Sequence, residues 1–168
     1  MSKKFVSDEF KVPSELKNKL FHIYPLRPGH CSLDYKAVMS SIQLLKGSFI
    51  YYPSWPEESM TFEKDLSDLK YHEKEFNNRT SFTYTVLNVE ENKCLGCIYI
   101  YPSKSTNFDA DVFMWVTQDA FDIGLYQILF DLVCNWIKNE WPFRKVNYVY
   151  NDKFRADVMS KAAFDIKT

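Results

Sequence analysis

Five segments of the chain carry apolar residues in the pattern of β-strands. Residues 20–26 alternate apolar and polar positions and end at a Pro-Gly turn. Residues 82–87 and 93–101 are rich in β-branched and aromatic side chains, and the polar connection between them is typical of a hairpin. A strand over residues 111–116 completes an antiparallel meander, and a further strand is predicted at residues 146–150.

Between these strands the apolar residues repeat at helical spacing. A helix is predicted over residues 33–46, with Ser32 able to cap its start and Gly47 able to end it. Further helices are predicted at residues 60–77, 124–140 and about 153–162.

The order of the predicted elements is β-α-α-β-β-β-α-β-α. The strand at 146–150 should lie parallel to its predecessor, because a right-handed crossover through a helix joins the two. The sequence therefore predicts an α/β fold of three layers, α/β/α, around a central mixed and mostly antiparallel sheet. A length of 168 residues fits one domain, which we place at residues 20–168 after an N-terminal arm at residues 1–19.

The charge and hydropathy of the chain argue against several classes of partner. The net charge is −1 and the charged residues are interspersed, so nothing indicates a nucleic-acid footprint. No segment approaches the roughly 20 apolar residues of a membrane span, and the first residues lack the apolar run of a secretory signal. We therefore expect a cytoplasmic protein that binds neither nucleic acid nor membranes.

The four cysteines are interpreted as free thiols in a reducing compartment. Cys94 and Cys97 have the spacing of a redox or zinc motif, but they fall inside a predicted strand. No second Cys or His pair stands at ligand distance from them in the sequence, and the three histidines are scattered. No metal site is predicted.

Two segments are candidates for binding. The chain from Val116 to Tyr126 runs from a strand end, through Gly124, into a long apolar helix. Backbone N–H groups at such a helix start can hold a phosphate, so this segment is the expected cofactor seat. The aromatic residues within 49–55 could form a substrate wall, or they could plug a gap in the core.

The order of elements, together with particular residues, resembles the GNAT acetyltransferase superfamily, whose members transfer the acetyl group of acetyl-CoA to an amine. Leu26-Arg27-Pro28 with Asp34 downstream is similar to the first strand and first helix of that family. Val116, Gly124 and Leu129 fall on matching positions of the pyrophosphate signature. Phe121 stands at its Gln/Arg position, Tyr126 stands at its final Gly/Ala position, and Asp122 adds a negative charge beside the seat.

The resemblance implies a site for acetyl-CoA as co-substrate. Strand-end backbone N–H groups near Trp115 and Val116 would bind the acetyl carbonyl and the pantetheine arm. The segment at the helix start would hold the pyrophosphate, and Asn151 or Asp152 would fill the place of an Asn that family members carry after the penultimate strand. The implied cofactor-binding residues are Trp115, Val116, Phe121, Ile123, Gly124, Leu125, Tyr126 and Asn151.

Proton transfer has several candidates. Acetyl transfer needs a neutral amine, so a base must accept its proton. Asp111 is the candidate base, with Asp109, Glu57 and Glu58 as alternatives. Family members carry a Tyr on the last helix, but that position falls on Met159, which cannot donate a proton. Tyr148 and Tyr150 on the preceding strand are the candidate donors in its place.

Three functions stay open at this point. The first is a GNAT-like N-acetyltransferase that acts on a small-molecule or peptide amine. The second is a catalytically inactive GNAT-fold binding or regulatory module, which the residues at 121, 126 and 159 favour. The third is an unrelated α/β ligand-binding or interaction domain that uses the aromatic residues at 49–55. No concentration of charge in the sequence identifies the acceptor, and a homodimer is possible at an open sheet edge.

Overall fold

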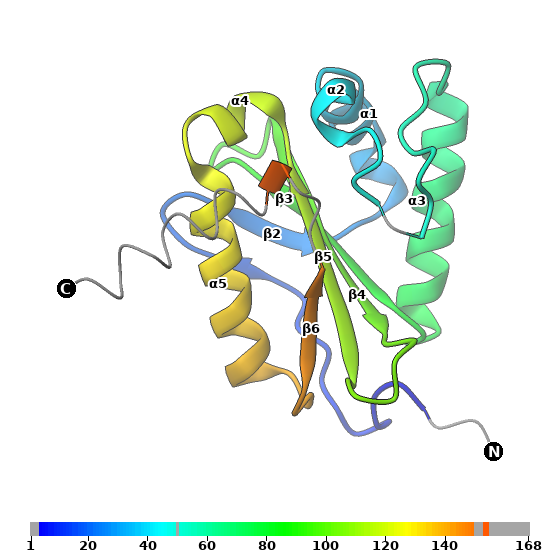
Figure 1. Ribbon diagram of the computed structural model, residues 1–168, viewed down its shortest axis with the longest axis vertical. Helices are drawn as coiled ribbons and strands as arrows, with labels where there is room; N and C mark the ends of the chain where they lie inside the picture. The colour runs from blue at the N-terminus through cyan, green and yellow to red at the C-terminus, as the bar shows by residue number, and fades with distance from the viewer. Residues whose placement is uncertain (1–3, 50, 150–152, 155–168) are drawn as a thin grey trace.

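A mixed sheet forms the centre of the molecule (Figure 1). The computed structural model describes residues 4–49, 51–149 and 153–154. Within these ranges the sheet has six strands that are neighbours in chain order. All pairings are antiparallel except that of β5 with β6, which is parallel as predicted. The strands are β1 (Leu16–Lys17), β2 (His22–Pro25), β3 (Phe82–Leu87), β4 (Cys94–Pro102), β5 (Ala110–Val116) and β6 (Val146–Val149).

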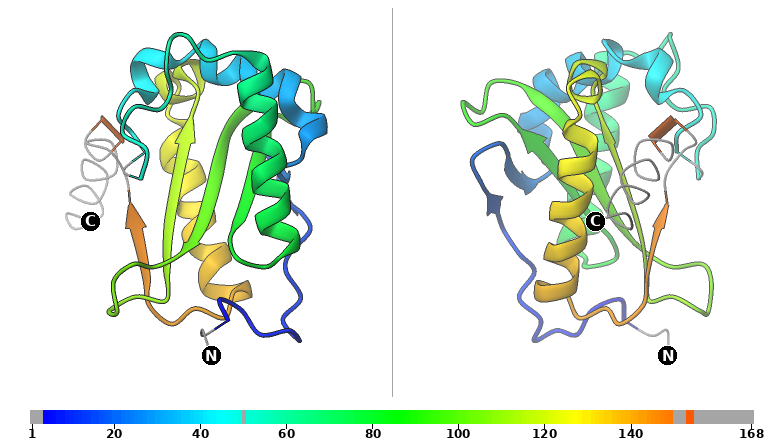
Figure 2. Two further views of the ribbon diagram at one scale, coloured as in Figure 1. Left: turned by 90° about the vertical axis from the view of Figure 1, so that its right-hand side faces the viewer. Right: turned by 60° about the vertical axis from the view of Figure 1, so that its left-hand side comes forward.

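Helices cover both faces of the sheet, which confirms the predicted α/β/α arrangement (Figures 1 and 2). One face carries α1 (Cys31–Met39), α2 (Ile42–Leu45) and α3 (Phe62–Asn77). The opposite face carries α4 (Gln118–Asp122) and α5 (Leu125–Glu140). None of the helices in the described ranges has the length and apolarity of a membrane span.

The single helix predicted at residues 33–46 is wrong in two respects. It begins earlier, at Cys31, with His30 as its N-cap, so Ser32 lies inside it. It is also interrupted, because α1 ends at Met39 and α2 starts at Ile42. The Ser40 hydroxyl donates to the Ala37 carbonyl at 2.9 Å, and such local side-chain bonds compete with the helical ladder.

The connection from β5 to α5 also differs from the predicted turn. A short helix, α4, stands between them, and Thr117 caps it by accepting a hydrogen bond from the Ala120 N–H. Gly124 then forms the N-cap of α5 with a φ of 80°. This left-handed conformation favours glycine, because a side chain on the same backbone would be strained.

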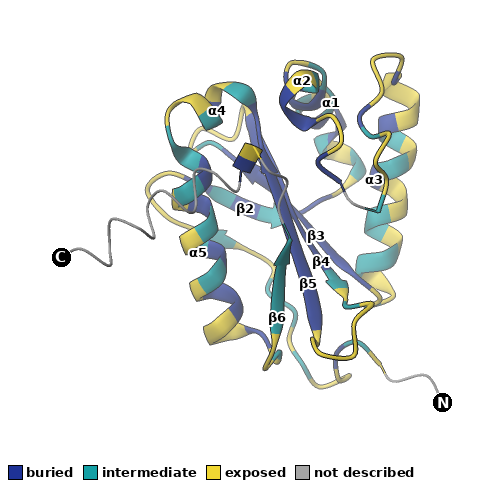
Figure 3. Ribbon diagram, in the orientation of Figure 1, coloured by how far each residue is buried: buried dark blue, intermediate teal, exposed yellow. Residues whose placement is uncertain are grey.

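The core lies on both sides of the three central strands. Strands β3 and β5 are buried along their whole length, and β4 is buried up to Ile100 (Figure 3). On the α5 face, the Tyr84 and Trp136 rings meet edge to face with centroids 5.0 Å apart. The end of the arm joins the sheet, since Leu16 and Lys17 pair with β2. The helix predicted at 153–162 lies outside the described residues apart from its first two positions.

Candidate active site

The end of β5 directs one backbone N–H away from β4. The Thr117 N–H donates to the Leu95 carbonyl at 2.9 Å, which fixes its direction toward β4. Because N–H groups alternate in direction along a strand, the Val116 N–H points to the β6 side and the Trp115 N–H points to β4. Phe113 pairs with Val149, the last described residue of β6, and Val116 follows three positions later along β5.

The start of α5 is open to solvent. Gly124, its N-cap, makes no side-chain cap, and the preceding Ile123 is 73% exposed. The first N–H groups of a helix attract anions. The exposed Asp122 carboxylate accepts a hydrogen bond from the Gln118 side chain at 2.7 Å, which directs part of its charge away from that helix end.

The two aromatic residues in the predicted phosphate segment point inward. The Tyr126 ring is fully buried and stacks on Phe154, with centroids 4.4 Å apart. Phe121 meets the same Phe154 ring at 5.5 Å. Tyr126 therefore packs in the core, although the signature places a small residue there. Asn151 and Tyr150, the other residues predicted near this end, lie outside the described residues.

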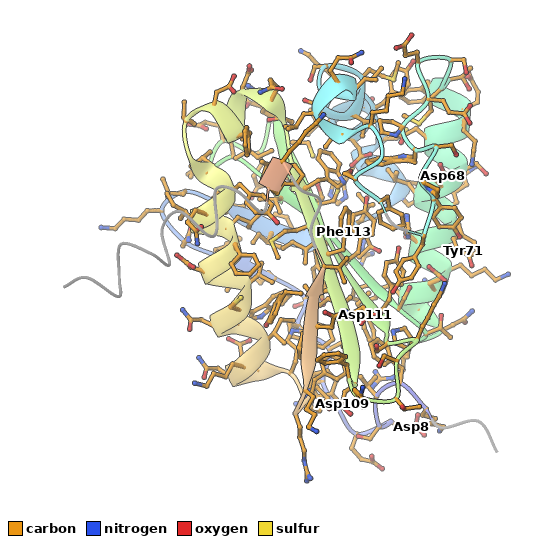
Figure 4. The ribbon with its side chains drawn as sticks, in the orientation of Figure 1. Asp8, Asp68, Tyr71, Asp109, Asp111 and Phe113 are labelled. Carbon is orange, nitrogen blue, oxygen red and sulfur yellow. The ribbon has the colours of Figure 1, made fainter. Side chains whose placement is uncertain are left out.

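A cavity of about 750 Å³ lies on the face of the sheet opposite α5. Its walls are α1, α3, the connection before α3, and β4. Asp68 and Tyr71 line it from α3, across from Asp111 and Phe113 on β5 (Figure 4). Its aromatic lining is Phe49, Tyr51, Tyr52, Trp55, Tyr71, Tyr99 and Tyr101. Its acidic lining is Asp34, Glu57, Asp65, Asp68 and Glu75, and its basic lining is Lys64, Lys104 and His72.

The aromatic connection serves as both core and wall. Phe49 is buried and packs against the sheet, with its ring centroid 4.8 Å from Phe113 and 5.1 Å from Tyr99. Tyr51 is half-buried, while Tyr52 is 63% exposed at the mouth. The Lys104 ammonium lies 4.2 Å from the Tyr51 ring centroid, so this wall already binds a cation by a cation–π contact.

Asp34 and Asp65 form a buried carboxyl pair in the lining of this cavity. Asp34 belongs to α1 and Asp65 to α3, and the two carboxyl groups influence the pKa of each other. Burial, then the Asp65 charge, raises the pKa of Asp34 well above its usual range. Burial likewise raises the pKa of Asp65, although a hydrogen bond from the Cys31 thiol opposes the shift. The pair therefore retains a proton where exposed carboxyls have none.

The predicted base Asp111 is already fully engaged. Its carboxylate accepts hydrogen bonds from Tyr51 at 2.5 Å, Ser103 at 2.8 Å and Asn147 at 3.1 Å. Burial acts to raise its pKa, but these three donors outweigh burial and hold the pKa of Asp111 below its usual range. Such a carboxylate is a weak base, and its contact with Tyr51 holds one wall of the cavity.

The alternative bases are spread apart. Asp109 accepts backbone hydrogen bonds from Arg144 at 2.8 Å and Lys145 at 3.0 Å, which anchors the start of β6. Glu57 lines the cavity, and Glu58 is exposed beside it on the same connection.

Tyr148 faces α5 and not the cavity. Its ring lies 5.5 Å from Phe130, and burial raises the pKa of its hydroxyl. The sheet therefore separates Tyr148 from the cavity and from the Asp111 carboxylate, which contacts Tyr51 there. The other predicted donor, Tyr150, lies outside the described residues.

The Cys94 and Cys97 thiols both lie close to Asp34. The three ligand atoms are within 4.8 Å of one another, all in buried residues. Cys97 donates to the Asp34 carboxyl at 3.2 Å, and Cys94 is a donor to the Gly96 carbonyl at 3.4 Å. Burial raises the pKa of the Cys97 thiol well above its usual range, so it is held as S–H. We assign these thiols a structural role as hydrogen-bond donors.

Sequence reasoning missed the carboxyl pair. Asp34 and Asp65 lie 31 positions apart on two different predicted helices, and neither stands in a motif of catalytic spacing. One signal was available, because each carboxylate stands among apolar positions of its helix. That signal is common to many capping or surface aspartates, so it does not identify a pair.

Comparisons of the sequence with family models and with curated proteins give no match. Solved structures do match. Ribosomal-protein-S5-alanine acetyltransferase from Vibrio fischeri has a TM-score of 0.69 and 12% identity, over 89% of this chain and 81% of that one. RimJ from Mycobacterium smegmatis, in complex with CoA-disulfide, has a TM-score of 0.63 and 11% identity, over 83% and 68%.

A third structure is the microcin C7 self-immunity acetyltransferase MccE in complex with acetyl-CoA and AMP. Its TM-score is 0.59 at 12% identity, over 74% of this chain and 67% of that one. The chain therefore has the fold of the GNAT acetyltransferases, at 11–12% sequence identity to these three structures.

Proposed function

We propose that the protein is an acetyl-CoA-dependent N-acetyltransferase whose amine acceptor enters the cavity beside α3. The observation that carries this proposal is the arrangement of the cavity and the β5 end around the same strands. The cavity lies on the α1–α3 face of β4, and Val116 at the end of β5 pairs with Gly96 of β4 and directs its N–H to the β6 side. An acceptor and a thioester could therefore approach the same strand end from two sides.

The residues present fit acetyl-CoA at this end of the sheet. The α5 start is uncapped and exposed, so its N–H groups can receive the pyrophosphate. Tyr126 points into the core and leaves that approach free. The Val116 N–H is the donor directed toward the acetyl carbonyl. Related structures with CoA or acetyl-CoA bound support this use of the fold. When bound, acetyl-CoA supplies the activated acetyl group.

The cavity fits an amine. Its lining holds more carboxyl groups than lysines, and its aromatic wall already binds the Lys104 ammonium. A cationic amine would be attracted by both features. Only the folded chain brings these carboxyl groups together, because the acidic residues of the lining come from α1, α3 and the connection between them.

The test is calorimetry of acetyl-CoA binding, followed by an amine-dependent assay of CoA release. We expect saturable binding that weakens at least tenfold in Ile123→Glu, because the new carboxylate would face the pyrophosphate at the α5 start. Ile123→Gln is the matched control of similar size without the charge. Absence of binding at millimolar acetyl-CoA would overturn the proposal. Binding without turnover on any amine would favour the inactive binding module.

A further inference from the structure

The buried carboxyl pair takes part in no salt bridge among the described residues, unlike Asp68 and Glu75 of the same cavity. Asp68 forms an ion pair with Lys64, and Glu75 lies 3.7 Å from His72 and accepts from Ser81. Among the described residues, no salt bridge involves either member of the pair. Buried negative charge without a cation is costly, so the pair is poised to receive a cation from outside.

The pair is placed for chemistry at the end of β5. The Asp34 carboxyl lies 3.2 Å from the Cys97 thiol of β4, and Cys97 stands opposite Trp115 of β5. Val116, which follows Trp115, carries the N–H directed to the proposed acetyl carbonyl. The carboxyl pair is thus separated from the β5 backbone by about one strand spacing, roughly 5 Å, plus the depth of the side chains, and the Val116 N–H points from that backbone to the β6 side.

We propose that Asp34 and Asp65 form the binding site for the acceptor's primary ammonium group and take the proton that this group must lose. The proposal rests on the proposed acetyl transfer and names its acceptor class: an alkyl ammonium whose chain passes between aromatic rings. A free small amine and a peptide amino group share this chemistry.

The proposed reaction conserves protons when the carboxyl pair carries one proton before the amine binds. In the proposed step the pair starts with one proton and one negative charge, and it accepts a second proton from the bound ammonium. The neutral amine then attacks the acetyl carbonyl of the thioester. The C–N bond forms, the C–S bond breaks, and the second proton lost by nitrogen goes to the departing thiolate. The pair afterwards releases its extra proton to water.

The pH dependence of this step is set by all the titratable groups that surround the carboxyl pair. The titratable groups that face it come from α1, α3 and β4. They are Cys31, Asp68, His72, Cys94, Cys97 and Tyr99. Burial raises the pKa values of the Cys97 thiol and the Tyr99 hydroxyl, so both stay protonated near neutral pH. In the proposed step the proton exchanged is one held by the two aspartates.

The first experiment measures amine binding to the full chain without acetyl-CoA. The probes are 1,5-diaminopentane, the peptide Ala-Ala-Ala and the neutral 1,5-pentanediol. We expect at least one amine to bind, the diol not to bind, and Asp65→Asn and Asp34→Asn each to weaken the amine at least tenfold. The amine that binds identifies the source as a small molecule or a peptide.

The control variant is Asp8→Asn, which removes an exposed carboxylate of the arm that pairs with Lys4, well below the cavity in Figure 4. It should bind the amines as the unchanged protein does. Near-UV circular dichroism establishes that each variant is folded. If both pair variants keep amine affinity within twofold, or if the diol binds as tightly as the amine, the proposal is overturned.

The second experiment records kcat/KM against pH with the amine that binds. Asp65→Asn should lower kcat/KM about 10²-fold or more at pH 7, and the loss should shrink as the pH approaches the pKa of the amine. An unchanged pH profile would contradict the proton-transfer role. Acetyl-CoA binding is measured in parallel. Amine binding that depends on Asp65, in a protein that binds no acetyl-CoA, would retain the ammonium site and reject the transferase.

Discussion

Replacing Gly96 by alanine is expected to displace the strand end beside the proposed acetyl site. Gly96 lies on β4, opposite Val116 of β5. A Cβ on Gly96 would stand 2.0 Å from the Trp115 carbonyl oxygen and 3.0 Å from the Val116 Cα, whereas ordinary contact begins at 3.4 Å. The atoms it meets belong to the backbone and cannot rotate away, so β5 must move by more than an ångström.

The expected loss is about 3 kcal/mol of the free energy of unfolding. Overpacking a buried site costs about 1–3 kcal/mol. Each strained ladder bond, such as that from the Thr117 N–H to the Leu95 carbonyl, adds about 1 kcal/mol. In a domain of this size each kcal/mol lowers Tm by about 2–4 °C, so a fall of about 6–12 °C is expected.

The assay is thermal and urea denaturation, with acetyl-CoA calorimetry on the same samples. Gly29→Ala is the matched control, because a Cβ there has nothing within 4 Å. It should change the free energy of unfolding by less than about 0.5 kcal/mol. We expect Gly96→Ala also to weaken acetyl-CoA, since the displaced backbone carries the Val116 N–H. A Gly96→Ala protein as stable as the Gly29→Ala control would refute the reasoning.

Three further predictions concern the buried polar and aromatic residues. Because the folded pKa of Asp34 is raised, its stabilising contribution is complete below the unfolded pKa near 3.9 and is lost as pH rises through the folded value. Denaturation between pH 5 and 8 should give a slope of up to about −1.4 kcal/mol per pH unit, and Asp34→Asn should flatten it. Asp111→Asn should cost about 1–3 kcal/mol in urea denaturation and raise KM for the amine, because Tyr51 loses a charged acceptor, while the pH profile of kcat stays unchanged. Tyr126→Ala should cost about 3–5 kcal/mol in urea denaturation, because its ring is buried against Phe154.

Each of these has an outcome that contradicts it. Equal pH slopes in Asp34→Asn and the unchanged protein would mean that the pair does not hold its proton. A lost pH limb in Asp111→Asn would restore that carboxylate as the base. A Tyr126→Ala protein of unchanged stability would show that the ring is not buried in solution.

The sequence by itself determined the three central strands, the two long helices and their order. Strands β3, β4 and β5 and helices α3 and α5 lie within a few residues of the predicted bounds. Their apolar residues follow periods of about 2 and 3.6, which each segment carries locally. The GNAT resemblance also came from local features, since Val116 and Gly124 mark the strand end and helix start that the structure contains.

The tertiary structure alone decided which side chains share a site. It broke the first helix at Ser40, inserted α4 before Gly124, and turned Tyr126 into the core. It also joined Asp34 and Asp65 in one cavity while engaging Asp111 in hydrogen bonds. The physical reason is that burial, and with it the pKa of a carboxyl group, depends on contacts between segments far apart in the chain. Hydrophobic periodicity records which face of an element is buried, but it does not record which polar group from another element meets that face.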